Sequence, residues 1–269
     1  MLYNRWNLPN LDRVIILQYK STTPLVFIHG SFASANSWRK IIERVGDEYE
    51  CIAFDLPGHG RMDDPDDFAH PSLMPEFESI INATENKIGP QGGIHLVGHS
   101  YGGVVALAAA MQGVVPIRKL TLFEPVDAAV LPLFGEQKAM DTVLEFVDSY
   151  CSAAKKGENF ACGRVIDFWG GDGSFDAIPK YIQEAMATMT KNNLRHWDLC
   201  KNENRNISDF EALNIPVTLV NGALSNNVAK TITSSLNRHL PNSKLETING
   251  ASHFMVTSHP DECAKIIKT

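Results

Sequence analysis

The chain has 269 residues, and its apolar content of 44% is sufficient for the core of one large or two small domains. Its net charge of −7, without a cluster of Lys or Arg, argues against binding to nucleic acid or to an anionic membrane. The five cysteines are scattered, odd in number and never in a C-x-x-C pair, which argues against a disulfide framework and against a zinc site. Neither a signal peptide nor a membrane helix is predicted, so we expect a cytoplasmic protein with a small-molecule partner. The sequence leaves open whether the chain forms a homodimer.

Short apolar or β-branched runs recur along the chain, with helical patterns between them. This alternation predicts an α/β fold with a mostly parallel, doubly wound central sheet and helices on both faces. Several runs are apolar at nearly every position, as strands covered on both faces must be. The predicted strands are VIILQY (14–19), PLVFIHG (24–30), ECIAFDLPGHG (50–60), GIHLVGHS (93–100), KLTLFEP (119–125), IPVTLVNG (215–222) and KLETING (244–250).

Helices are predicted after these strands at residues 36–45, 101–112, 228–239 and 260–268, the last of which starts with a proline that suits a first helical turn. Residues 128–210 break the alternation, because they contain helical patterns without a convincing strand. We interpret this segment as a helical cap inserted into a core formed by residues 1–127 and 211–269.

The cap segment is rich in aromatic side chains. We expect most of them to pack the cap onto the core, while the others would face an apolar substrate. They are Phe134, Phe146, Tyr150, Phe160, Phe168, Trp169, Phe175, Tyr181 and Trp197.

The motif Gly98-His99-Ser100-Tyr101-Gly102 lies between a predicted strand and a predicted helix. This context is typical of a nucleophile on a sharp strand-to-helix turn, where glycines on both sides let neighbouring backbone pass closely. Ser100 is therefore the predicted nucleophile. The amide of Tyr101, at the start of the helix, is positioned to stabilise an oxyanion.

A second oxyanion donor is expected in the loop that follows His29-Gly30. The amide of Ser31 is the first candidate and that of Phe32 is the alternative. We expect His29 to hold this loop by hydrogen bonds rather than to act as a base. His99 is next to the nucleophile, but on such a turn its side chain points away from it.

The general base is expected late in the chain, in a loop after the last strand. His253 occupies that place in NGASHFMVTSHP, whereas His259 already belongs to the start of the terminal helix. The sequence therefore predicts His253 as the base.

The acid departs from the commonest pattern, because no carboxylate follows Gly222, where Ser225 and Asn226 stand instead. A buried carboxylate is still needed to orient the imidazole. Glu124 ends the preceding apolar strand at the same sheet edge and is the preferred candidate. Asp127 and Asp209 are the alternatives.

With HGSFASANSW, FDLPGHG, GHSYGG, LFEPVD and GASHFMVTSHP in this order, the chain resembles the α/β-hydrolase superfamily over essentially its whole length. It is most similar to a bacterial, esterase-like branch whose acid follows the sixth strand as Glu-Pro and whose cap carries a segment like DFWGGDGSF. The resemblance implies Glu124 as the acid, with Ser225 in place of the usual aspartate. Asp55 and His59 of FDLPGHG are expected to be structural.

These features predict a serine hydrolase that cleaves a carboxylic ester, thioester or lactone of a small, apolar substrate through an acyl-enzyme on Ser100. No metal or organic cofactor is expected, because the polar clusters lack ligand spacing and no G-x-G-x-x-G follows a strand. Two other classes stay open. Similar proteins include cofactor-free haloperoxidases, lyases and carbon–carbon bond hydrolases with the same catalytic residues, and the missing aspartate after Gly222 also permits a non-catalytic binding protein.

Overall fold

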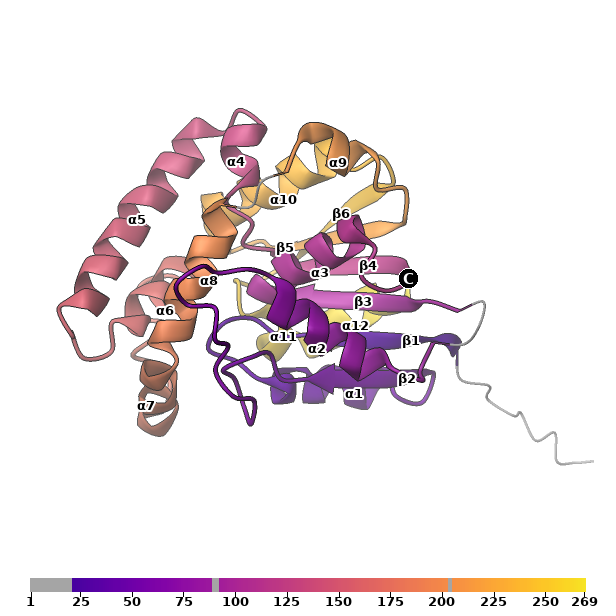
Figure 1. Ribbon diagram of the computed structural model, residues 1–269, viewed down its shortest axis with the longest axis horizontal. Helices are drawn as coiled ribbons and strands as arrows, with labels where there is room; N and C mark the ends of the chain where they lie inside the picture. Colours follow the sequence, from indigo (N-terminus) through magenta and orange to yellow (C-terminus); the bar gives the residue numbers. More distant parts are fainter. Residues whose placement is uncertain (1–20, 89–91, 203–204) are drawn as a thin grey trace, which may run out of the picture.

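Parallel strands form one central sheet, in the spatial order β2-β1-β3-β4-β5-β6 (Figure 1). The computed structural model describes residues 21–88, 92–202 and 205–269. Every strand ladder within these residues is parallel, which confirms the predicted sheet. The strand predicted at 14–19 lies outside the described residues. The strands are β1 (Ser21–Ile28), β2 (Tyr49–Phe54), β3 (Ile94–His99), β4 (Ile117–Phe123), β5 (Val217–Gly222) and β6 (Ser243–Ile248).

The central strands β3 and β5 are buried at every position, whereas β2 and β6 at the sheet edges are mostly half-buried. Burial on both faces explains why the central strands are apolar runs rather than alternating patterns. Because all strands are parallel, their carboxyl ends meet at one edge of the sheet. The loops after β1, β3, β4, β5 and β6 therefore converge there.

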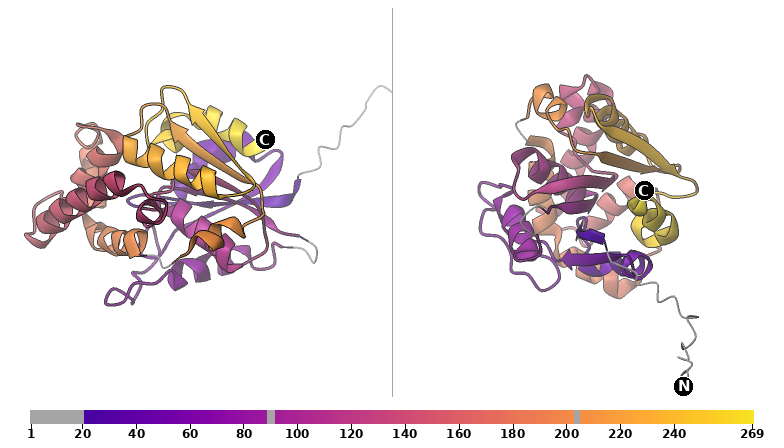
Figure 2. Two further views of the ribbon diagram at one scale, coloured as in Figure 1. Left: turned by 90° about the horizontal axis from the view of Figure 1, so that it is seen from above. Right: turned by 90° about the vertical axis from the view of Figure 1, so that its right-hand side faces the viewer.

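Two layers of helices cover the sheet, as the right-hand view in Figure 2 shows with α12 and α2 on opposite sides. Successive side chains of a strand point to opposite faces, so Phe27 packs in one hydrophobic cluster and Ile28 in the other. The first layer comprises η1 (Ala35–Trp38), α1 (Arg39–Val45), α11 (Met255–Ser258) and α12 (Pro260–Lys268). The second comprises α2 (Met74–Thr84), α3 (Tyr101–Gln112) and α10 (Asn227–His239).

Of the four predicted helices, α3 and α12 have the predicted bounds and α10 begins one residue earlier, whereas the helix predicted at residues 36–45 is divided into the 3-10 helix η1 and the α-helix α1. The helix α2 was not predicted. Its buried face carries Phe77 and Ile80 but also the fully buried Glu76. A carboxylate within the apolar face interrupts the periodicity by which such a helix is recognised.

Only helices and loops connect β4 to β5 in the described part of the chain. Figure 1 shows α5, α6, α7 and α8 beyond one end of the sheet, whereas α4 and α9 lie beside α10 of the core. The predicted cap boundary at residue 210 falls inside α9. The helices are α4 (Val130–Leu133), α5 (Gln137–Lys155), α6 (Cys162–Gly170), α7 (Lys180–Thr188), α8 (Thr190–Asn202) and α9 (Ile207–Glu211).

Two findings bear on the composition of the chain. None of the five cysteines is in a disulfide. Among the described helices, none combines the length and the apolarity needed to cross a bilayer.

Candidate active site

Ser100 lies on a tight turn between β3 and α3. Its backbone has φ 56° and ψ −123°, a conformation that is strained for any residue other than glycine. The turn requires two glycines: a Cβ on Gly102 would lie 2.3 Å from the carbonyl oxygen of Ile28, and one on Gly98 would lie 2.4 Å from that of Gly102. The sequence motif thus folds into the strand-turn-helix geometry that exposes a nucleophile at the sheet edge.

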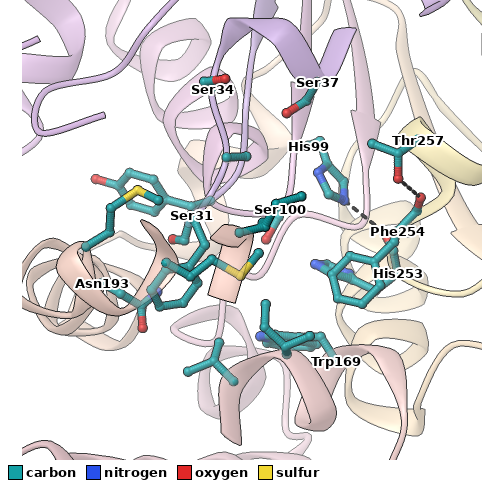
Figure 3. Close-up of a pocket in the computed structure, with 18 of the residues that line it drawn as sticks. Ser31, Ser34, Ser37, His99, Ser100, Trp169, Asn193, His253, Phe254 and Thr257 are labelled. Atoms are coloured by element: carbon teal, nitrogen blue, oxygen red, sulfur yellow. Dashed lines mark hydrogen bonds between the residues drawn. The ribbon is translucent and has the colours of Figure 1, made fainter. Parts of the chain in front are cut away.

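His253 lies in the loop after β6 and faces Ser100 across the pocket floor (Figure 3). Its side chain is almost fully buried, and its Nδ1 is 2.7 Å from Oε2 of Glu124. Because Nδ1 is bound to the carboxylate, Nε2 is the nitrogen left to accept a proton from the serine.

Glu124 directly follows β4, next to β5 in the sheet, and is fully buried. Its backbone φ is 41°, so it too has a strained conformation. Its Oε1 accepts hydrogen bonds from the Gly222 amide, at 2.7 Å, and from the Ser225 hydroxyl. Burial alone would raise the pKa of Glu124, but the hydrogen bonds from His253, Ser225 and Gly222 lower it below its usual value. The carboxylate is therefore held ionised against the imidazole.

The two alternative acids have other partners. Asp127 is fully buried and forms an ion pair with Arg205. Asp209 is exposed and accepts the amide hydrogen of Asn206, which caps α9. Neither carboxylate contacts His253, so the geometry favours Glu124 among the three candidates.

Ser31 and Tyr101 both line the pocket beside Ser100. Tyr101 is the first residue of α3, so its amide has no partner within the helix. The loop that carries Ser31 passes directly over Ser100, because a Cβ on Gly30 would lie 2.8 Å from the Cβ of Ser100. Phe32, the alternative donor, has a φ of 56° and continues this loop.

Other histidines near the site are engaged elsewhere. His29 hydrogen-bonds through Nδ1 to the Gly30 carbonyl and through Nε2 to the Leu56 amide, which joins the loops after β1 and β2. Nε2 of His99 donates to the backbone carbonyl of His253 at 2.8 Å (Figure 3). Burial lowers the pKa of both His29 and His99 to about 3, so both rings are neutral and hold the backbone of the site.

FDLPGHG also has a structural role. Asp55 accepts the amide hydrogens of Ala35 and Arg61. Nδ1 of His59 donates to the Pro57 carbonyl within its own turn. These contacts hold the loop after β2, and neither side chain is among the residues that line the pocket beside Ser100.

Ser100 opens onto a pocket of about 920 Å³ between the core loops and α6, α7 and α8. On the side of the inserted segment the lining is mostly apolar, with Ser174, Thr188, Asn193 and His196 as its polar residues. Ser34, Asn36 and Ser37 contribute polar side chains on the other side, and Figure 3 shows Ser34 and Ser37 opposite Trp169. The charged lining residues, Arg39 and Lys40, are both cationic and exposed. The apolar lining residues of the inserted segment are Val165, Ile166, Trp169, Ala177, Ile178, Pro179, Ile182, Ala185, Met186, Met189 and Trp197.

Most of the aromatic side chains singled out in residues 128–210 do not line the pocket. Of the nine singled out from the sequence, Trp169 and Trp197 line it, and Trp169 also stacks on His253 with ring centroids 5.2 Å apart. Phe146 and Phe168 stack on each other at 4.0 Å, away from the pocket lining. Tyr181 is 71% exposed.

A buried ionic network beside the pocket was not predicted from the sequence. Arg195 of α8 forms ion pairs with Asp67 and with Glu76, and Glu76 also accepts the hydroxyl hydrogen of Tyr101 at 2.8 Å. No motif identifies these residues, which lie far apart in the chain. The sequence did point to Ser225, which donates to Glu124, because this serine stands where the usual aspartate is missing.

No group of three His, Cys, Asp or Glu side chains is placed to hold a metal ion within the described ranges.

Comparisons with known proteins identify the family and the fold of the chain. A model of the alpha/beta hydrolase family matches residues 25–266. Over 88 residues the chain is 38% identical to an uncharacterized hydrolase, YugF, of Bacillus subtilis, a match that covers 33% of this chain and 31% of YugF. Over 91 residues it is 34% identical to a putative 2-succinyl-6-hydroxy-2,4-cyclohexadiene-1-carboxylate synthase of Haemophilus influenzae, covering 33% of this chain and 34% of that protein.

The chain thus matches only about a third of the length of these two curated relatives. Among solved structures, MenH from S. aureus superposes with a TM-score of 0.69 at 21% identity and covers 93% of both chains. At this identity the likeness is one of fold.

Proposed function

The chain belongs to the alpha/beta hydrolase family, and from this premise we propose that it is a serine esterase acting on carboxylic esters with an apolar acyl group. The observation that carries the proposal is the hydrogen bond of 2.7 Å between Nδ1 of His253 and the buried carboxylate of Glu124, with Ser100 facing the same imidazole. An ionised carboxylate on Nδ1 orients the ring and stabilises its cation, which is what general-base activation of a serine requires.

The reaction proceeds in two halves. His253 takes the hydroxyl proton of Ser100 as Oγ attacks the ester carbonyl carbon, and the carbonyl oxygen becomes an oxyanion held by the amides of Ser31 and Tyr101. The protonated imidazole then donates its proton to the departing alkoxide, which leaves an acyl-enzyme. Water, deprotonated by His253, attacks this acyl group; the acid is released and the serine regains its proton.

The pocket supports the choice of substrate. The apolar lining contributed by α6, α7 and α8 suits an acyl chain, because burying each methylene contributes about 0.8 kcal/mol. The opposite side, next to η1 and α1, is polar and carries Arg39 and Lys40. We assign the apolar side to the acyl group and the polar side to the leaving group, with residues 128–210 acting as the cap over the acyl side.

A second candidate function uses the same residues for a cofactor-free elimination. It is supported by the match to the putative synthase of Haemophilus influenzae. In that reaction His253 would remove a proton from the substrate and the oxyanion donors would stabilise an enolate, so no acyl-enzyme would form.

The test is the hydrolysis of p-nitrophenyl esters from acetate to laurate, with Ser100→Ala as the control. We expect turnover by the wild-type protein that Ser100→Ala abolishes, together with covalent labelling of Ser100 by a fluorophosphonate, seen by mass spectrometry. Labelling without turnover of any ester would redirect the assignment to the elimination. Neither labelling nor turnover would indicate a binding protein.

A further inference from the structure

His196 of α8 reaches both residues that are proposed to donate to the oxyanion. Its ring is 1% exposed and stacks on the ring of Tyr101, with centroids 3.7 Å apart and planes inclined by 9°. Its Nδ1 is 2.7 Å from the hydroxyl oxygen of Ser31. One side chain of the inserted segment therefore contacts the loop after β1 and the first residue of α3.

The tautomer of His196 follows from its burial. Burial, together with the neighbouring His59 and Arg195, lowers its pKa well below the usual value, so the ring is neutral and carries one proton. Nε2 is buried without a hydrogen-bond partner among the described residues. A buried N–H without an acceptor is rarer and more costly than a bare acceptor nitrogen. The proton is therefore on Nδ1, which donates to Ser31 and leaves the Ser31 hydroxyl hydrogen directed elsewhere.

The neighbouring residue fixes His196 in place. Arg195 is bound by the carboxylates of Asp67 and Glu76, and its Nη2 also donates to the Ser72 carbonyl at 2.6 Å. Glu76 in turn accepts from the hydroxyl of Tyr101. Tyr101 is consequently held at its hydroxyl by Glu76 and at its ring face by His196, and α8 cannot move away without breaking buried ion pairs.

We propose that His196 is a positioning residue of the oxyanion site, which sets the backbone of Ser31 through a hydrogen bond and that of Tyr101 through ring stacking. This inference rests on the proposed function. Donors stabilise a developing oxyanion only when they are held in place before the reaction, and a displacement of about 1 Å can cost about 100-fold in rate. The segment between β4 and β5 therefore contributes to the catalytic machinery as well as to the substrate pocket.

Three variants separate the two contacts. His196→Phe keeps a ring to stack on Tyr101 but loses the donor, His196→Asn keeps an N–H near the position of Nδ1 but loses the ring, and Ser31→Ala loses the hydroxyl but keeps the amide. We expect kcat to fall about 10- to 100-fold in His196→Phe and in Ser31→Ala, with KM within about twofold of the wild-type value. His196→Asn keeps the hydrogen bond but loses the stacking on Tyr101, so we expect its kcat to lie below that of the wild type and above that of Ser31→Ala; a wild-type kcat in this variant would overturn the role of the stacking.

Two further readouts exclude a merely structural effect. The double variant His196→Phe/Ser31→Ala is expected to be no slower than the slower single variant, because both remove the same hydrogen bond. The inhibition constant of a trifluoromethyl ketone, which forms a tetrahedral oxyanion with the serine, is expected to rise by the factor by which kcat/KM falls. His95→Gln, a buried histidine of β3 bonded to Thr121, serves as the control and should keep the wild-type kcat.

The inference and the proposed function fail in different ways. Wild-type ester turnover that Ser100→Ala abolishes but that His196→Phe and Ser31→Ala leave unchanged overturns the role of His196 and keeps the esterase. If no ester is turned over, the rate of fluorophosphonate labelling of Ser100 tests His196 in the same variants, because that reaction uses the same donors. An unchanged labelling rate overturns the inference. If His196→Phe does not fold, Ser31→Ala carries the test.

Discussion

Ser225 donates a hydrogen bond to the carboxylate of Glu124 from the position after Gly222 at which the chain lacks an aspartate. Glu124 follows β4 and Ser225 follows β5, the next strand of the sheet. The carboxylate beside His253 therefore comes from the end of β4, and the serine after β5 donates a hydrogen bond to it.

Replacing the carboxylate of Glu124 should leave the imidazole of His253 without the group that orients it. We expect Glu124→Gln to lower kcat by about 10³- to 10⁴-fold with little effect on KM, because the amide favours the wrong imidazole tautomer. Adding Ser225→Asp to that variant should raise kcat again by at least about tenfold, since residue 225 already contacts the side chain of residue 124 and would place a carboxylate near His253. Both effects are measured as steady-state kinetics on the best p-nitrophenyl ester.

Asp209→Asn and Asp127→Asn are the controls for the acid, because these carboxylates were the alternatives. Each variant should have a kcat within about threefold of the wild-type value, and circular dichroism checks that each is folded. Full activity in Glu124→Gln together with loss in Asp127→Asn would transfer the role of the acid to Asp127.

The apolar side of the pocket should select for acyl length. We expect kcat/KM to rise about three- to fourfold for each added methylene until the chain fills the cavity, since burial contributes about 0.8 kcal/mol per methylene. Met186→Trp, which places a larger ring on the α7 wall of the pocket, should shorten the preferred chain and leave acetate unaffected. Leu144→Trp on the exposed face of α5 is the matched control. If Met186→Trp lowered kcat/KM equally for acetate and laurate, the acyl chain would not bind against the α7 wall of the pocket.

The polar side of the pocket should prefer anionic over cationic leaving groups. Lys40 has no ion pair among the described residues, whereas Arg39 pairs with Glu43 at 3.0 Å. We expect the wild-type protein to hydrolyse 4-carboxyphenyl butyrate faster than 4-(trimethylammonio)phenyl butyrate. Lys40→Glu should reduce this preference several-fold at low ionic strength, and salt should weaken the effect.

Lys138→Glu changes the net charge by the same amount on exposed α5, outside the pocket lining, and should leave the preference for leaving groups unchanged. An equal shift in both variants would attribute the preference to the overall charge of the protein rather than to the pocket.

Breaking the ion pairs of Arg195 with Asp67 and Glu76 should lower the free energy of unfolding. Arg195→Met leaves the carboxylates of Asp67 and Glu76 without their cation, and Glu76 is fully buried. We expect the free energy of unfolding in urea to fall by about 3–5 kcal/mol. Arg164→Met, which breaks the exposed ion pair with Glu158, should change it by less than about 1 kcal/mol. A loss in Arg195→Met no larger than in Arg164→Met would mean that the network contributes little to stability.

Buried neutral histidines should make the fold sensitive to acid. Burial, as the largest cause, lowers the pKa of His95 to about 3 from an ordinary value near 6.5. Between these values the unfolded chain binds the proton and the folded chain does not, so stability is full above pH 6.5 and falls as the pH drops. His95→Gln should reduce the slope of the unfolding free energy between pH 4 and 6 by about 1.4 kcal/mol per pH unit.

His70→Gln provides the matched control, because the side chain of His70 is exposed, and it should keep the wild-type slope. The measurement is urea unfolding at a series of pH values. A slope in His95→Gln equal to that of the wild type would mean that His95 binds its proton equally in the folded and unfolded states.

Local patterns were sufficient to predict the strands within the described residues, the helices that follow them with the exception of α2, and the turn that carries Ser100. Strand periodicity, flanking glycines and the order of elements depend on residues close together in the chain, and the parallel sheet brings the strand ends to one edge. Glu124 and His253 could be singled out for the same reason, since Glu124 directly follows β4 and His253 lies in the loop after β6, at that edge of the sheet.

The choice among three carboxylates needed the tertiary structure. Asp127 is held by Arg205, which lies 78 residues away, and Asp209 caps its own helix. His196 contacts Ser31 across 165 residues, and Arg195 contacts Glu76 across 119. Such pairs depend on how the inserted helices dock on the core, and a short window of sequence encodes the conformation of its own backbone but not the partner that packing brings to it.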